Sequence, residues 1–156
     1  MINKFLVISG SAKKVADGSI WGYGPYITEL NIWLKYVNHA VIIAPQSKDA
    51  ISPIDIEIKS KDIKFIPVPE VSVKSPKEII RALFYSPYIL FVILIHGWRT
   101  ELIHLRAPSN LGFLGSVAQI FLPKKRKIAK YAANFDFNSK QPLFNRLQRS
   151  ILNNPT

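Results

Sequence analysis

Short apolar runs alternate along the chain with stretches in which apolar residues recur at helical spacing. The run Lys4–Ser9 has an unbroken apolar centre, which is typical of a strand buried on both faces of a parallel sheet. Similar runs predict four further strands, at His39–Pro45, Ile63–Val68, Leu102–Ala107 and Arg126–Ala133. Because strands and helical stretches alternate, the sequence predicts an α/β domain with a mainly parallel sheet.

Four helices are predicted around these strands. Pro25 suits the first turn of a helix through Ile27–Val37, and Ser75 followed by Pro76 is a typical start for a second helix. We expect Pro87 to kink or divide that second helix. The other two are expected at Leu111–Phe121, capped by Ser109 or Asn110, and at Gln141–Leu152, where Leu143, Phe144, Leu147 and Ile151 form an amphipathic pattern.

Two segments interrupt this alternation of strands and helices. Gly10–Tyr23 contains several glycines and is predicted to be a long loop after the first strand. Ile51–Ile58 alternates apolar and polar residues, which predicts an extra extended segment near an edge of the sheet.

Composition narrows the class of protein. With 156 residues the chain has the size of one domain, and a hydrophobic fraction of 48% is sufficient to fill a core. The chain contains no cysteine, which excludes disulfides, zinc–thiolate sites and cysteine nucleophiles. The N-terminal residues lack the pattern of a secretory signal, so we expect a cytoplasmic protein. The apolar stretch Leu83–Ile95 is shorter than the about 20 residues of a membrane span, which favours a buried or interfacial helix.

The charge is strongly basic, with 21 Lys and Arg residues against 10 acidic residues and a net charge of +11. The excess is concentrated between Lys124 and Arg149, where Asp136 is the single acidic residue. Such a field attracts phosphates, whether on a nucleotide, an anionic membrane or a nucleic acid. For the isolated run Lys124–Lys127, a solvated basic surface is the favoured interpretation.

In an open parallel sheet, ligands bind beyond the carboxyl ends of the strands. The first loop at that edge contains Gly22, Tyr23 and Gly24 ahead of a predicted helix, so its backbone N–H groups suit an anion. The dinucleotide pattern G-x-G-x-x-G is not met, because Ile27 stands where its third glycine is required. A flexible glycine loop without a ligand is an equally good interpretation.

The loop after the fourth predicted strand is the stronger candidate. His104 and Arg106 point to the same face of that strand because side chains alternate along it. Arg106 suits a two-pronged contact to a phosphate or carboxylate, and His104 suits proton transfer near neutral pH. Each residue alone is better explained structurally, but the pair directly before a helix start, with Asn110, favours a binding site.

The third loop, after the fifth predicted strand, contributes Asp136. This carboxylate is a candidate contact for a hydroxyl-rich ligand, although neutralising nearby Lys or Arg side chains is the simpler role. The sequence contains no spacing of His, Asp or Glu typical of a metal site, no Walker-type phosphate loop and no serine nucleophile elbow.

Taken in order, these motifs resemble the N-terminal domain of GT-B glycosyltransferases, especially the group-1, family-4-like set. The resemblance rests on the first apolar strand, the loop Gly22–Pro25, the strand-turn Ile103–Gly112, and Lys130–Asp136 before a basic amphipathic helix. It implies one Rossmann-like, three-layer half of a two-domain fold, with residues 1–152 as the acceptor-side domain and 153–156 as the start of an interdomain linker.

The resemblance also implies a function. It implies that the chain is part of an enzyme transferring a sugar from a nucleotide-sugar donor to a glycan or lipid-linked acceptor, without a metal or other cofactor. Gly22 and Gly24 would approach the donor diphosphate, and His104 and Arg106 the reacting sugar. The donor-binding domain is absent from these 156 residues, so we expect no turnover by this chain alone. The basic excess and the apolar stretch Leu83–Ile95 also resemble features by which such enzymes sit on membranes that carry lipid-linked acceptors, which implies a peripheral position at the inner face of the cell membrane.

The competing hypothesis is a basic α/β module that binds an anionic membrane or nucleic acid and catalyses nothing. No RNA- or DNA-reading motif accompanies the basic stretch, which disfavours a specific nucleic-acid partner. A complete small enzyme of another Rossmann-like class is disfavoured by the missing phosphate fingerprint.

Overall fold

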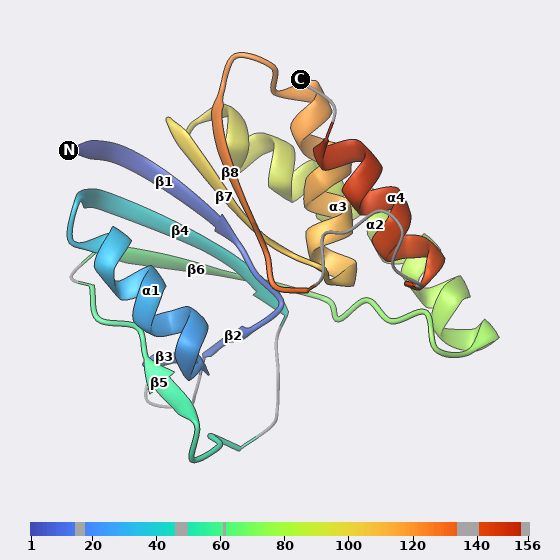
Figure 1. Ribbon diagram of the computed structural model, residues 1–156, viewed down its shortest axis with the longest axis horizontal. Helices are drawn as coiled ribbons and strands as arrows, with labels where there is room; N and C mark the ends of the chain where they lie inside the picture. The colour runs from blue at the N-terminus through green and yellow to red at the C-terminus, as the bar shows by residue number, and fades with distance from the viewer. Residues whose placement is uncertain (15–17, 46–49, 61, 134–140, 154–156) are drawn as a thin grey trace.

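The computed structural model describes residues 1–14, 18–45, 50–60, 62–133 and 141–153. Its centre is a five-stranded sheet in which all neighbouring strands run parallel, in the order β6-β4-β1-β7-β8 (Figure 1). The strands are β1 (Ile2–Ile8), β4 (Val37–Pro45), β6 (Ile63–Val68), β7 (Leu102–Ala107) and β8 (Arg126–Tyr131). This confirms the predicted α/β class, and β6 and β7 have the predicted bounds.

Helices cover both faces of this sheet (Figure 1). On one face lies α1 (Gly24–Leu34). On the other lie α2 (Pro76–Trp98) and α3 (Asn110–Ala118), extended by the 3-10 turn η1 (Gln119–Phe121), and then α4 (Leu143–Leu152) against α3. The result is the three-layer, Rossmann-like arrangement that makes up one half of a GT-B-type fold.

The central strand supplies both hydrophobic cores. Phe5 and Val7 of β1 pack toward α1, while Leu6 and Ile8 pack toward α2 and α3, and all four side chains are fully buried. Successive side chains of a strand point to opposite faces, so a strand covered on both sides must be apolar throughout. This explains the continuous apolar run at the start of the sequence.

A second, smaller sheet lies beside α1 and corrects one prediction. Instead of a loop over Gly10–Tyr23, the chain forms β2 (Ala12–Lys14) and β3 (Ile20–Tyr23), which pair antiparallel. β3 also pairs with β5 (Asp55–Glu57), so the predicted extended segment exists but extends this small sheet rather than the main one.

The helix starts follow the expected local chemistry. The Ser75 hydroxyl accepts a hydrogen bond from the Glu78 N–H at 3.3 Å, and the Ser109 hydroxyl accepts one from the Gly112 N–H at 2.9 Å. Of the two predicted caps of α3, Ser109 is therefore the one used. Pro87 does not divide α2, which continues through it as one helix of 23 residues.

The last helix is amphipathic, but its apolar side faces outward. Leu143 and Leu147 are 65% and 44% exposed, whereas Gln148 and Arg149 are buried on the side toward α3. The Gln148 amide donates a hydrogen bond to the Ser116 hydroxyl of α3 at 3.0 Å. The helix ends at Leu152; the interdomain linker predicted after it stays a prediction, and residues 154–156 lie outside the described part of the chain.

Candidate binding site at the carboxyl edge of the sheet

The carboxyl ends of β1 and β7 lie side by side, because Ile8 pairs with Leu105 in the sheet. The turn after β1 therefore meets the start of α3. A Cβ atom placed on Gly10 would lie 3.7 Å from the hydroxyl of Ser109, the residue that caps α3. Two chain turns and one helix N-terminus converge here, at the edge where parallel sheets bind ligands.

Arg106, one of the predicted binding residues, is held at this edge by residues distant in sequence. One of its terminal nitrogens donates a hydrogen bond to the Ser11 hydroxyl. Its guanidinium carbon lies 4.8 Å from the ring centre of Tyr26 and 5.8 Å from that of Tyr23. These two rings and one hydroxyl fix the orientation of the guanidinium.

The electrostatic environment of Arg106 is unusual for a half-buried cation. Burial lowers the pKa of its guanidinium, although Tyr26 and Tyr23 act in the opposite direction. An arginine remains charged in proteins. Within the described residues no carboxylate forms an ion pair with it, and its Nε is buried without a hydrogen-bond partner. A cation of this kind is suited to an anionic ligand.

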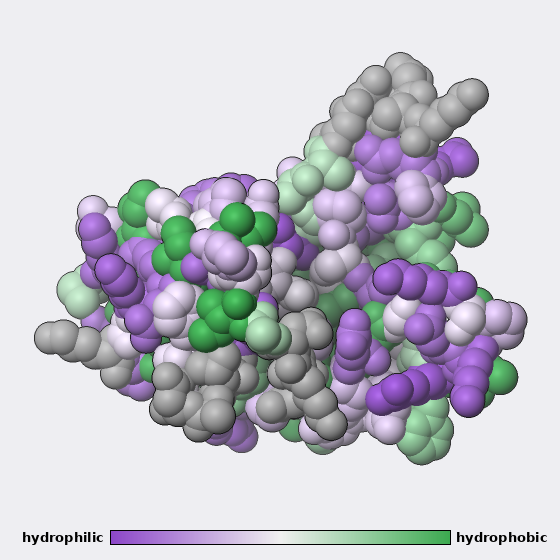
Figure 2. Space-filling model, turned by 90° about the horizontal axis from the view of Figure 1, so that it is seen from below, coloured by the Kyte–Doolittle hydropathy of each residue, from purple (hydrophilic) through white to green (hydrophobic). Residues whose placement is uncertain are grey.

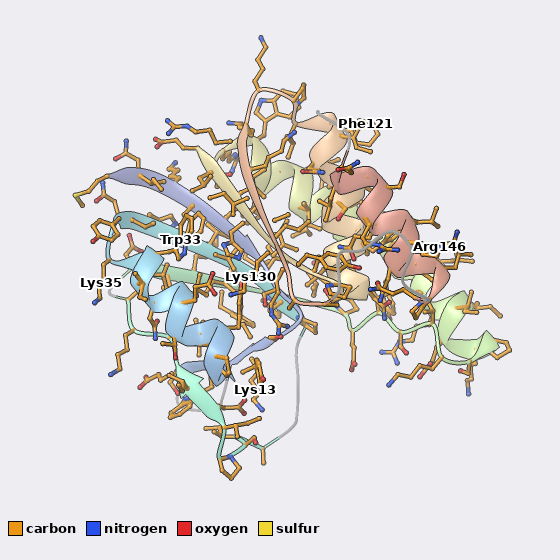
Figure 3. The ribbon with its side chains drawn as sticks, in the orientation of Figure 1. Lys13, Trp33, Lys35, Phe121, Lys130 and Arg146 are labelled. Carbon is orange, nitrogen blue, oxygen red and sulfur yellow. The ribbon has the colours of Figure 1, made fainter. Side chains whose placement is uncertain are left out.

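His104 occupies a different environment from Arg106, although both side chains lie on the α1 face of the sheet. It is 1% exposed and surrounded by the rings of Phe5, Tyr26 and Trp33, with centroids 5.8 to 6.1 Å away. Trp33 reaches it from α1 (Figure 3). Burial lowers the pKa of His104 to about 4, so the ring is neutral at pH 7. This environment is that of a side chain packed in the core, and the catalytic role of His104 stays a prediction.

The positions of Gly22 and Gly24 lie so close to other backbone segments that a side chain has no room there. A Cβ on Gly22 would lie 2.3 Å from the Ser11 carbonyl oxygen, and one on Gly24 would lie 2.5 Å from the Ile54 carbonyl oxygen. Only glycine fits such approaches without movement of the backbone. Both glycines therefore have a structural reason to be present, and their contact with a donor diphosphate stays a prediction.

Tyr23, between these two glycines, is 43% exposed and lines a cavity of about 210 Å³ at the carboxyl edge. The cavity is polar, and its other walls are Gly10, Ser11, Ala12, Lys13, Pro45, Asp55 and Glu70. In the view from below, the molecular surface is hollowed between the part built on α1 and the part built on the other helices (Figure 2). The predicted residue Tyr23 thus lines a polar cavity at this edge of the sheet.

An ion pair closes one side of this cavity. The Lys13 ammonium lies 2.8 Å from a carboxylate oxygen of Asp55, and the two residues belong to β2 and β5 of the same small sheet. Figure 3 labels Lys13 beside this sheet. The hydrogen bonds from Lys13 and from the Ser52 N–H lower the pKa of Asp55. Sequence reasoning did not single out Ser11, Lys13, Asp55 or Tyr26, because their relevance follows only from contacts between segments far apart in the chain.

Among the predicted site residues that the structure describes, Tyr23 lines this cavity, and Gly22, Gly24, His104, Arg106 and Asn110 are not among its walls. The Asn110 amide donates a hydrogen bond to the Val71 carbonyl at 2.8 Å, which ties α3 to the segment before α2. Asp136 lies outside the described residues. No group of three or more His, Asp or Glu side chains suited to a metal ion occurs in the part of the chain that the structure describes.

Comparison with known proteins identifies the fold. No protein-family model and no curated protein matches the chain. A solved UDP-N-acetylglucosamine 2-epimerase superposes with a TM-score of 0.56 and 13% identity, over 97% of this chain and 39% of its own. A putative UDP-N-acetylglucosamine 2-epimerase from Listeria monocytogenes superposes with a TM-score of 0.52 and 13% identity, over 95% of this chain and 35% of its own.

These similarities place the chain in a class by its fold. It is a Rossmann-like α/β domain that matches one part of a larger GT-B-type architecture, and it spans 39% and 35% of the two similar chains. At 13% identity the likeness concerns the fold alone, since one fold serves many chemistries.

Proposed function

We propose that this chain is the acceptor-side domain of a glycosyltransferase that moves a sugar from a nucleotide-sugar donor to a glycan or lipid-linked acceptor. Three observations support the proposal. The fold is of the GT-B type, both similar structures are named as acting on a UDP-sugar, and the carboxyl edge of the sheet presents a cation without a carboxylate partner among the described residues. The third observation, the environment of Arg106, carries the argument.

The chemistry of sugar transfer explains why such a cation is useful. When the bond between the sugar carbon and the donor phosphate oxygen breaks, the bonding electrons stay on the leaving diphosphate, and its negative charge grows. A fixed guanidinium stabilises that growing charge with little reorganisation. Ser11, Tyr23 and Tyr26 already hold Arg106 in one orientation. In this proposal Arg106 binds a phosphate of the donor or of a phosphate-bearing acceptor.

The direct test is ligand binding by matched arginine variants. We expect UDP-N-acetylglucosamine, UDP or inorganic pyrophosphate to raise the melting temperature of the wild-type protein made from its complete reading frame and to give a measurable Kd by calorimetry. Arg106→Gln should weaken that binding at least tenfold, since a charge-assisted hydrogen bond contributes about 1.5–3 kcal/mol. Arg106→Lys should recover part of it, because lysine restores the charge but not the two-pronged contact.

The matched control is Arg126→Gln, because Arg126 is an exposed arginine on the edge strand β8. It removes the same charge from the chain without touching the carboxyl edge. Equal weakening by the two glutamine variants would mean that only the overall basic field attracts the ligand. Absence of binding by the wild-type protein made from its complete reading frame to all three ligands would remove the support for the proposal.

The reaction itself requires the protein made from its complete reading frame, because this chain spans less than half of the similar structures. With that protein and a series of UDP-sugars, product analysis distinguishes two outcomes. Transfer of the sugar to an added glycan or lipid phosphate supports a glycosyltransferase. Inversion of the configuration at one carbon of the sugar, without any acceptor, would instead assign the chain to an epimerase.

A further inference from the structure

The outward side of α2 is apolar, although a helix at the surface of a soluble domain normally presents polar residues there. Six large apolar side chains on it are more than half exposed: Ile80, Leu83, Phe84, Tyr88, Phe91 and Trp98. The opposite side of the same helix packs on the sheet through Ile89 and Ile93, which are fully buried. Folding therefore uses one side of α2 and leaves the other side equally apolar. Such a patch marks an interaction site.

The same exposed surface continues onto the last helix. Leu143 and Leu147 of α4 face outward, on the side of the sheet that α2 also covers. Between the two helices lies a groove of about 170 Å³ whose walls include Leu83, Phe113 and Phe144. We call the exposed residues of α2, together with Leu143 and Leu147, the α2–α4 face.

Basic side chains border the α2–α4 face. Lys77 and Arg81 are exposed along α2, and Arg146 projects from α4 away from the sheet (Figure 3). Glu78 is the only acidic residue in α2, α3, η1 and α4, and its carboxylate already accepts hydrogen bonds from the Ser72 hydroxyl and the Lys74 N–H. Figure 2 shows hydrophobic surface beside hydrophilic surface at the end of the molecule where α2 begins.

At the other end of α2, a second recess combines aromatic and cationic groups. A cavity of about 330 Å³ is lined by Trp98, Phe121, Leu122, Pro123, Lys124 and Lys125. Trp98 and Phe121 are 69% and 62% exposed, and Phe121 projects from the end of the helical layer (Figure 3). Tryptophan beside lysine is typical of proteins that meet the boundary between lipid headgroups and acyl chains.

We propose that the α2–α4 face docks in the plane of an anionic lipid bilayer, with its apolar side chains among the acyl chains and its basic border on the lipid phosphates. Charge complementarity favours this occupant. Lys77, Arg81 and Arg146 border the face, and Glu78 is the only acidic residue in α2, α3, η1 and α4. A second copy of the chain would bring two such basic borders together, which repulsion opposes. An anionic leaflet attracts them.

Docking in the plane, rather than spanning, follows from the packing of α2. By length and composition this helix could cross a membrane, which the shorter stretch Leu83–Ile95 could not. A spanning helix would have to withdraw Ile89 and Ile93 from the core they share with β1. An in-plane position keeps that core intact and buries only the exposed side. The anionic cytoplasmic leaflet is the surface that this proposal assigns to the protein.

The experiment measures vesicle binding and the depth of one side chain. The chain is mixed with vesicles of phosphatidylcholine alone, or with 30% phosphatidylglycerol, and bound protein is measured by flotation at low and high salt. We expect binding to the anionic vesicles at low salt, weakened at least tenfold at high salt. Trp98 should give a blue-shifted fluorescence on binding, and Trp98→Phe should abolish that shift while Trp21 and Trp33 remain.

Variants of exposed side chains show which part of the surface contacts the vesicle. Phe84→Ser with Phe91→Ser should lower the partition coefficient at least tenfold, and Arg81→Gln should lower it about fivefold, as expected for one cation near a charged leaflet. Ile32→Ser is the control, because Ile32 is 54% exposed on α1, on the opposite face of the sheet, and its loss should leave binding unchanged. All of these side chains are exposed, so the variants should fold, which circular dichroism verifies.

Three results would overturn the proposal. The first is no flotation with anionic vesicles at low salt, and the second is undiminished flotation of the Phe84 and Phe91 variant. The third is a concentration-dependent dimer in ultracentrifugation that this variant abolishes while vesicles remain unbound, which would assign the face to a second copy of the chain. None of these outcomes depends on ligand binding at Arg106, so the two proposals are tested separately.

Discussion

The helices on the two faces of the sheet both bury an apolar side, but their outward sides differ. α1 buries Tyr26, Ile27, Leu30 and Leu34, and Ile32 is its only large apolar side chain that is exposed. α2 buries a comparable stripe yet leaves six large apolar side chains more than half exposed. Both helices pack apolar side chains against the sheet, so packing explains why the inward sides of both are apolar. It does not explain the outward side of α2, which we attribute to a lipid surface.

The difference also separates two kinds of recognition. Arg106, Tyr23 and Tyr26 face the α1 side, at the carboxyl edge, where a small polar cavity lies. The opposite layer is broad, apolar and basic at its border. In our proposal a phosphate-bearing ligand binds the first region, and a membrane holds the second.

The largest effect is expected from one substitution made in both layers. Leu30 is 1% exposed on α1, and Leu83 is 70% exposed on α2. Leu30→Ala should lower the free energy of unfolding by about 2–5 kcal/mol, because it removes buried apolar contacts and leaves a cavity. Leu83→Ala should change it by less than about 0.5 kcal/mol. Urea titration of both variants measures this, and a large loss in Leu83→Ala would show that another part of the protein covers α2.

A second effect concerns the buried His104. Its pKa is about 4 in the folded state, below the value of about 6.5 that a histidine has in an unfolded chain. Between these values the unfolded chain binds a proton that the folded chain does not, so stability falls as the pH falls from 6.5 to 4. The total loss is about 3 kcal/mol.

The measurement is the difference between wild-type protein and His104→Leu, by urea titration at pH 7 and at about pH 4.5. The variant should lose less stability on acidification than the wild type, because leucine does not titrate. Identical pH dependence of the two proteins would show that His104 reaches water in solution. That result would support its predicted catalytic role.

The features that the sequence predicted correctly are those that depend on residues close together in the chain. The bounds of β6 and β7 follow from apolar runs. The cap Ser75, and Ser109 as one of two alternatives with Asn110, follow from side chains that hydrogen-bond within one turn. The hairpin of β2 and β3 was missed because its glycines indicate a loop, and its pairing with β5 joins segments far apart in the chain. The orientation of α4 was open for a similar reason, since periodicity shows that a helix has two sides but not which one faces inward.

The site shows the same division. Side-chain alternation correctly put His104 and Arg106 on one face of β7, as their shared contact with Tyr26 shows. Alternation did not show how far each side chain lies from the end of the strand. His104 is buried in the core, whereas Arg106, two residues later, lies at the carboxyl edge. The contact between Arg106 and Ser11 joins positions 95 residues apart, which no local pattern reveals.

The smallest expected effect compares two glycines, one on each side of the sheet. A Cβ on Gly22 would meet the Ser11 carbonyl oxygen at 2.3 Å, and one on Gly97 would meet the Leu122 methyl group at 2.5 Å. The first neighbour is backbone and cannot move without disturbing β2, whereas the second is the end of a flexible side chain. Gly22→Ala should therefore cost about 1–3 kcal/mol.

For Gly97→Ala, the gain in helix propensity of up to about 1 kcal/mol should offset most of the crowding within α2. Urea midpoints of the two variants test this, with circular dichroism as the control for secondary structure. If Gly22→Ala is as stable as the wild type, the backbone around β2 adjusts freely. The polar cavity lined by Ser11 and Tyr23 would then be a pliable surface rather than a preformed site. A large cost would instead support a rigid recess on the α1 side, ready for a ligand before it binds.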